Sequence, residues 1–228
     1  FLNSSNFSKK FDYNNKFVIK FLKNIKFFLG NDYSKSNSVE KLENKIFIIS
    51  HRLNYKNNHD IYFREIKKKL GIKNYISINI NHTERETKSI KPVKNEIILS
   101  KKLNLIKEIY LIIQILITII KFPQVINNRK NFKDNCSVIN QSLYNLRIYF
   151  QIKEFIEKFK PKCIFFTYEG YCYERLICNL CKKHNIISYG YQSSVILKST
   201  YSIFNNYGKY FNPDIILSKN TFNYNLIE

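Results

Sequence analysis

The chain has 228 residues, with 38 Lys and Arg against 17 Asp and Glu, which gives a formal net charge of +21. Its hydrophobic residues (44%) and aromatic residues (16%) suffice for a core, which excludes a wholly disordered chain. The 6 Arg are few beside 32 Lys, and the charge is spread along the chain. Because base recognition relies on Arg, this pattern argues against specific nucleic-acid binding and favours an anionic membrane surface or a phosphorylated ligand.

Residues 1–44 are predicted to form a basic amphipathic segment followed by a linker. In residues 16–29, Lys recurs at helical spacing beside an apolar series of the same period: Phe17, Phe21, Ile25 and Phe28. This helix either lies on an anionic membrane or packs its apolar face on the domain. The polar start and the odd number of cysteines, 5, predict a cytoplasmic protein. Peripheral attachment to the inner face of the plasma membrane remains open.

From residue 45 onward, short apolar runs alternate with helical patterns. Strands are predicted at 45–50, 74–80, 96–99, 163–168, 186–191 and 215–218, and helices at 61–70, 103–126, 140–159 and 171–184. This alternation is typical of an α/β protein with a Rossmann-like parallel sheet and helices on both faces. Residues 45–228 are therefore predicted to form one Rossmann-like domain.

The most apolar stretch, residues 109–120, reads IYLIIQILITII. Twelve residues are too few to cross a bilayer. A helix that is apolar all round is usually buried in a core or at an interface, so we expect this segment to be covered. Contact with a membrane surface is the alternative.

Two predicted strand ends bring polar residues together. Glu169 follows one buried strand and precedes a helix that carries Glu174, and the next strand ends at Tyr191. The residues that follow are Gln192, Ser193 and Ser194. Because ligands of parallel sheets bind at the carboxyl ends of strands, these residues are candidates for one rim. The alternative for both glutamates is capping of the helix, with Glu174 paired to a nearby Lys or Arg.

Two further groups of residues have a functional and a structural interpretation. His51 and Arg52 follow the first strand of the sheet, where they would meet an acceptor or a phosphate unless they belong to a solvated loop. Cys172, Cys178, Cys181 and His184 have spacings that zinc ligands also show. All four lie on one predicted helix, so we expect the cysteines to pack as small apolar residues, with no metal site.

Three ordered motifs carry a resemblance to a known family: TYEGYCYERLIC, SYGYQSS and PDIILS. They resemble a family of bacterial surface-carbohydrate biosynthesis proteins, similar to glycosyltransferases built of two Rossmann-like halves (the GT-B architecture). The resemblance covers roughly residues 140–216 with specific motifs. It matches these positions: Glu169, Gly170, Glu174, Arg175, Tyr191, Gln192, Pro213 and Asp214. One departure is that the family pattern has His after the Gln, whereas this chain has Ser193 and Ser194.

The resemblance implies transfer of a sugar from a nucleotide-sugar donor to a glycan or lipid-linked acceptor in surface polysaccharide or lipopolysaccharide assembly. It implies that Glu169, or failing it Glu174, deprotonates the acceptor. It also implies that substrate is contacted by Gly170, Arg175, Tyr191 and Gln192, with Ser193 and Ser194 beside them. No Asp-x-Asp motif occurs, so neither metal nor cofactor is expected. In such enzymes a second half follows the Pro-Asp strand, so we expect residues 1–228 to be the N-terminal, acceptor-side half, inactive alone. The alternative is a non-catalytic, membrane-associated binding module or a degenerate transferase half.

Overall fold

The computed structural model describes residues 35–36, 44–51, 55–56, 59–80, 94–99, 103–121, 132–192 and 207–218. The chain divides into two compact units, one of residues 1–32 and 102–143, the other of residues 33–101 and 144–228. The second unit holds the sheet, so the boundary expected at residue 44 falls inside it. The basic segment 16–29 lies outside the described residues.

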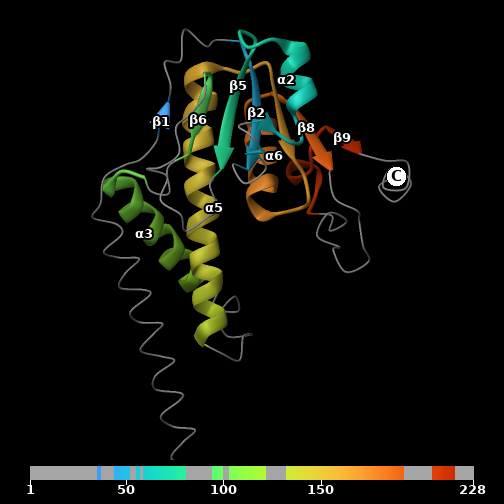
Figure 1. Cartoon of the computed structure of the whole chain (residues 1–228). Helices are drawn as coiled ribbons and strands as arrows, with labels where there is room; N and C mark the ends of the chain where they lie inside the picture. The colour runs from blue at the N-terminus through green and yellow to red at the C-terminus, as the bar shows by residue number, and fades with distance from the viewer. Residues whose placement is uncertain are drawn as a thin grey trace, which may run out of the picture. The chain divides into compact units, whose positions relative to one another are not determined.

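Within the described residues, seven strands form one sheet in the order β1-β6-β5-β2-β7-β8-β9 (Figure 1). Six are mutually parallel: β2 (Ile46–His51), β5 (Tyr75–Ile80), β6 (Glu96–Ile98), β7 (Cys163–Thr167), β8 (Ile187–Gln192) and β9 (Ile215–Ser218). Numbered along the chain, these six strands lie in the order 3-2-1-4-5-6, which defines the Rossmann fold. The predicted Rossmann-like parallel sheet is confirmed.

The strands match the predicted runs to within one or two residues, because each is a short apolar segment bounded by polar ones. Residues 35–36 differ: predicted as linker, they form β1 (Lys35–Ser36), which pairs antiparallel with β6. Two residues at a sheet edge leave no apolar pattern to detect. The loop predicted after β2 likewise contains a small hairpin of β3 (Tyr55–Lys56) and β4 (His59–Asp60).

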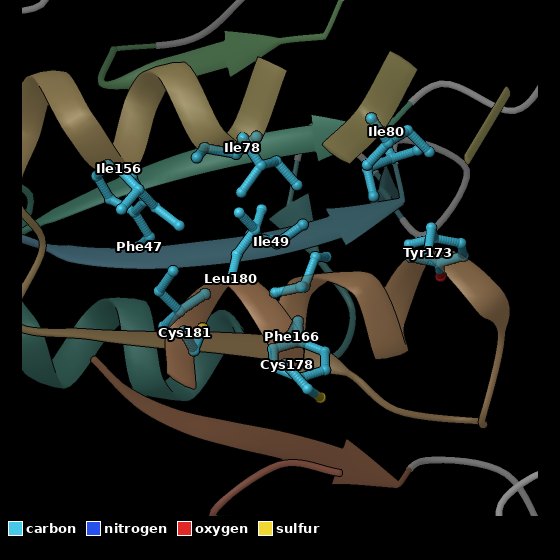
Figure 2. Close-up of a cluster of buried hydrophobic side chains, with 14 of the residues drawn as sticks. Phe47, Ile49, Ile78, Ile80, Ile156, Phe166, Tyr173, Cys178, Leu180 and Cys181 are labelled. Atoms are coloured by element: carbon cyan, nitrogen blue, oxygen red, sulfur yellow. The ribbon is translucent and has the colours of Figure 1, made fainter. Parts of the chain in front are cut away.

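The core lies on one face of the sheet, beneath α5 (Phe132–Phe159) and α6 (Cys172–Lys183). Figure 2 shows Phe47 and Ile49 of β2 beside Leu180 of α6 and Ile156 of α5, all fully or almost fully buried. The helix α2 (Arg64–Leu70) covers the opposite face, where the Lys67 amine donates to Ser77 Oγ at 2.9 Å. Helices therefore cover both faces, as predicted.

The long helices differ from the sequence prediction at their ends. The helix α3 (Leu105–Lys121) begins two residues later than predicted, and its predicted end at residue 126 lies outside the described residues. The helix α5 is already formed at Phe132, eight residues before its predicted start. Burial of the apolar stretch 109–120 in a core or at an interface was also expected, and burial in the core is wrong for much of α3: Ile109 is 49% exposed, Ile113 47% and Ile120 78%. None of the described helices is both long and apolar enough to cross a membrane.

Candidate functional site

The candidate site lies at the carboxyl ends of β2 and β7. These strands are hydrogen-bonded neighbours, yet the chain continues from β2 toward β5 on one side and from β7 toward β8 on the other. Such a reversal of strand order leaves a crevice in which Rossmann-like proteins bind ligands. His51 ends β2, and Glu169 and Gly170 follow β7, so the topology brings these three predicted residues to one place.

The turn after β7 is closed by its own glutamate. Gly170 has a φ of 82°, a left-handed conformation that favours glycine, and α6 begins two residues later. Glu174 Oε2 then accepts the backbone N–H of Glu169 at 2.8 Å and that of Tyr171 at 2.9 Å. These are N–H groups that a helix start leaves unsatisfied, so the capping alternative for Glu174 is confirmed. Both N–H groups are therefore already hydrogen-bonded within the protein, so they are not available to an anionic ligand.

Glu174 has no exposed surface. Its second oxygen, Oε1, accepts the hydroxyl of Tyr173 at 3.1 Å. Burial raises the pKa of Glu174 to about 8, against the hydrogen bonds from Glu169, Tyr171 and Tyr173, which lower it. The charge of Glu169 raises it further. Burial, with the neighbouring Glu174, also raises the pKa of Tyr173 well above its usual value.

A hydrogen-bonded chain joins this cap to the end of β2. His51 Nε2 lies 2.5 Å from the Tyr173 hydroxyl, and the two rings meet edge to face at 5.5 Å between centroids. Tyr173 is seen beyond the arrowhead of β2 in Figure 2. With Glu174 ionised, His51 donates to Tyr173, which donates to the carboxylate. With Glu174 protonated, both bonds can reverse. The tyrosine hydroxyl therefore links the proton on the glutamate to that on the imidazole.

Glu169 is half-buried at the rim of the same turn. Its backbone N–H donates to Glu174 Oε2, which fixes the position of its main chain. Its carboxylate lies near enough to raise the pKa of Glu174. Of the two predicted catalytic glutamates, Glu169 is therefore the one that is partly exposed, whereas Glu174 is fully buried.

Arg175 joins the first turn of α6 to the segment that precedes β9. Its Nη1 donates to Asn212 Oδ1 at 2.8 Å, its Nε donates to the Gly170 carbonyl at 3.4 Å, and its guanidinium lies 4.6 Å from the Tyr207 ring centroid. The residue is 6% exposed. These contacts within the protein indicate that Arg175, which the family motif matches, positions α6 against the segment before β9.

The Pro-Asp motif also has a structural role. Asp214 Oδ2 accepts the backbone N–H of Ser188 at 2.9 Å and its hydroxyl at 2.6 Å, and Oδ1 pairs with Lys182 of α6. Burial alone would raise the pKa of Asp214, but the hydrogen bonds from Lys182 and Ser188 outweigh it and lower the pKa. The motif thus ties β9 to β8 and α6.

The two predicted residues at the end of β8 lie on opposite faces of the sheet. Gln192 is fully buried on the face of α6. Tyr191 faces the other way, where its ring meets Phe63 at 5.8 Å and Tyr62 at 6.2 Å between centroids. Gln192 is thus the member of the pair on the side of Glu174. Three other predicted site residues lie outside the described residues: Arg52, Ser193 and Ser194.

A buried polar row on the α2 face was not singled out from the sequence. Ser50 Oγ donates to Asn79 Oδ1 at 3.1 Å, and Asn79 Nδ2 donates to the buried Glu96. Beside it, Lys67 forms a 2.8 Å ion pair with Asp60. The sequence did carry a pattern that indicates this row, because Ser77 and Asn79 are polar and spaced two apart within an otherwise apolar strand.

Two of the three helix cysteines pack as small apolar residues, as expected, and the expectation is wrong for Cys172. Cys178 and Cys181 have no exposed surface and belong to the core, where burial raises the pKa of both thiols, that of Cys181 to about 12. Cys172, a turn and a half earlier, is exposed. The buried pair therefore fills space as small apolar side chains.

Comparison with protein-family models, curated proteins and solved structures gives no match for this chain. The functional argument therefore rests on the crevice between β2 and β7 and on the residues at its rim.

Proposed function

We propose that this chain is a glycosyltransferase-like protein of surface polysaccharide or lipopolysaccharide synthesis, which takes part in transferring a sugar from a nucleotide-sugar donor to a glycan or lipid-linked acceptor. One observation carries the proposal: Glu169 lies half-buried at the strand-order reversal of a Rossmann-like sheet. That is where this fold binds nucleotide-like ligands.

Sugar transfer needs a base that takes the proton of the acceptor hydroxyl as the bond to the sugar forms. Glu169 has a carboxylate at the rim, where a hydroxyl can approach it. Glu174 is less suitable, because it is fully buried and accepts three hydrogen bonds from its own turn. The net charge of +21 favours approach of a diphosphate-bearing donor.

The test is a transfer assay with the full chain and, where the gene encodes more, the complete protein. Labelled uridine, guanosine and cytidine nucleotide sugars are offered with lipid-linked acceptors from bacterial membranes. Glu169→Gln is expected to lower the transfer rate about 100-fold or more, because general-base catalysis contributes roughly that much. Donor binding, measured by calorimetry, should stay within a factor of a few of the unsubstituted protein.

Glu157→Gln is the matched control. Glu157 is exposed on α5, which ends just before β7 begins, so it lies toward the amino ends of the strands, away from the crevice. Its substitution should leave transfer unchanged. Transfer that persists in Glu169→Gln would remove Glu169 as the base, and failure of the complete protein to bind any nucleotide sugar would refute the proposal.

A non-catalytic binding module is the second candidate. It is favoured by the way Glu174 and Arg175, two residues matched to the family motif, are engaged in contacts within the fold. Nucleotide-sugar binding in the complete protein without turnover, unaffected by Glu169→Gln, would support this function instead.

A further inference from the structure

The exposed side of α3 is almost wholly apolar. Six residues repeat at helical spacing along it and form what we call the α3 stripe: Ile106, Ile109, Ile113, Leu116, Ile117 and Ile120. Their side chains are between 38% and 80% exposed. Leu105, Tyr110 and Ile112 widen the stripe on its flanks and are also exposed. An apolar surface of this continuity usually marks an interaction site.

The covered side of the same helix is mixed, because it carries the fully buried Leu111 beside polar residues. Glu108 is 1% exposed, and its carboxylate accepts the backbone N–H of Leu103 at 2.9 Å. Gln114 is half-buried. The helix therefore leaves most of its isoleucines toward solvent although Leu111 is buried, an arrangement that costs free energy in water and is favourable against an apolar medium.

The hydroxyl of Thr118, also on the exposed side, is already satisfied. Thr118 Oγ1 donates to the carbonyl of Gln114 at 2.8 Å, one turn back in the helix. A hydroxyl bonded in this way enters an apolar medium without losing a hydrogen bond to water. Lys121, at the end of the helix, is exposed and long enough to keep its amine in a headgroup layer.

Charge decides between a membrane and a second copy of the chain. The sequence of the unit that includes α3, residues 1–32 and 102–143, has 12 basic and 4 acidic residues. Two copies would bring like charges together, whereas anionic lipids attract Lys near their surface by about 1 kcal/mol each. Stable attachment to a bilayer needs two signals, and the α3 stripe together with the net positive charge of this unit's sequence supplies both.

We propose that the α3 stripe docks the chain on the surface of an anionic membrane, with the isoleucine side chains inserted at the boundary of headgroups and acyl chains. The helix lies in the plane of the surface and does not span it. This surface is independent of the crevice between β2 and β7, so it stands whether or not the chain acts on sugars.

The test is co-sedimentation of the full chain with two kinds of vesicles, phosphatidylcholine alone and phosphatidylcholine mixed with phosphatidylserine. Binding is expected to the mixed vesicles, at least tenfold tighter than to the neutral ones, and to weaken with added salt. Ile113→Asp and Ile113→Ser should each reduce it at least tenfold, because both place a polar group in the centre of the stripe.

Ile61→Asp is the matched control, since Ile61 is 59% exposed just before α2 in the other unit, and its substitution should leave binding intact. Circular dichroism confirms that each variant is folded, and light scattering measures the oligomeric state without vesicles. Equal binding of Ile113→Ser and the unsubstituted chain, or equal binding to both vesicles, would overturn the proposal. A dimer that Ile113→Ser dissociates would also overturn the proposal, because the α3 stripe would then be the interface with a second copy of the chain.

Discussion

Glu174 combines full burial with three hydrogen-bond donors that favour its charged form. Burial is the larger effect, and the pKa reaches about 8. The group is therefore poised to change its charge near neutral pH, and it is joined through Tyr173 to His51 at the crevice. A residue that caps a helix thereby also senses the protonation of its surroundings.

Removing the Tyr173 hydroxyl should raise the pKa of Glu174 above 8. The hydroxyl donates to the carboxylate and so favours the ionised form, and Phe at this position cannot donate. Carbon-13 NMR of the Glu side-chain carboxyls follows the titration, with the Glu174 signal identified by its loss in Glu174→Gln. Tyr189→Phe, on the opposite face of the sheet, is the control and should leave the titration in place. A Glu174 pKa that falls or stays constant in Tyr173→Phe would contradict this account of the cap.

At the scale of elements, α6 is held at both its ends by side chains that reach other segments. Arg175 in its first turn bridges the Gly170 carbonyl and Asn212, while Lys182 in its last turn pairs with Asp214. The helix α6 is therefore tied to β9, the last strand of the sheet.

Arg175→Lys should lower the free energy of unfolding by about 1–3 kcal/mol. A single amine cannot replace the fork that donates from Nε to Gly170 and from Nη1 to Asn212 while it covers the Tyr207 ring. Arg64→Lys, on the exposed surface of α2, makes the same change and should cost less than about 0.5 kcal/mol. Urea unfolding measures both. Equal effects of the two substitutions would show that the bridge contributes little to stability.

The sequence is enough to predict the central strands and the order in which strands and helices alternate, because the short apolar runs bounded by polar residues match the strands. It predicts the placement of Glu169 at a strand end for the same reason. It did not decide the role of Glu174, since both capping and catalysis fit its spacing. The link from His51 to Tyr173 joins residues 122 positions apart, and no local pattern carries such a contact. The start of α5 was missed because its first turns are polar and lack a helical apolar period.

At the scale of the whole molecule, two carboxylates are expected to shape the dependence of stability on pH in opposite directions. Glu174 has a raised pKa, so between about 4.5 and 8 the folded chain holds a proton that the unfolded chain has lost. Its contribution to stability is complete below pH 4.5 and is lost as the pH rises through 8. Asp214 has a lowered pKa, so its contribution is present above about 3.8, the usual pKa of the group, and is lost as the pH falls.

Glu174→Gln should therefore remove the alkaline decline, since Gln is a neutral copy of the protonated side chain. Its carbonyl can accept both turn N–H groups while its amide donates to Tyr173. At ~1.4 kcal/mol per pKa unit, the variant should gain up to ~5 kcal/mol on the unsubstituted chain as the pH rises from 4.5 to 8. Asp214→Asn should instead lower the free energy of unfolding, most at neutral pH and least in acid. Urea unfolding across this range measures both, and a constant difference between Glu174→Gln and the unsubstituted chain would mean that Glu174 keeps its ordinary pKa.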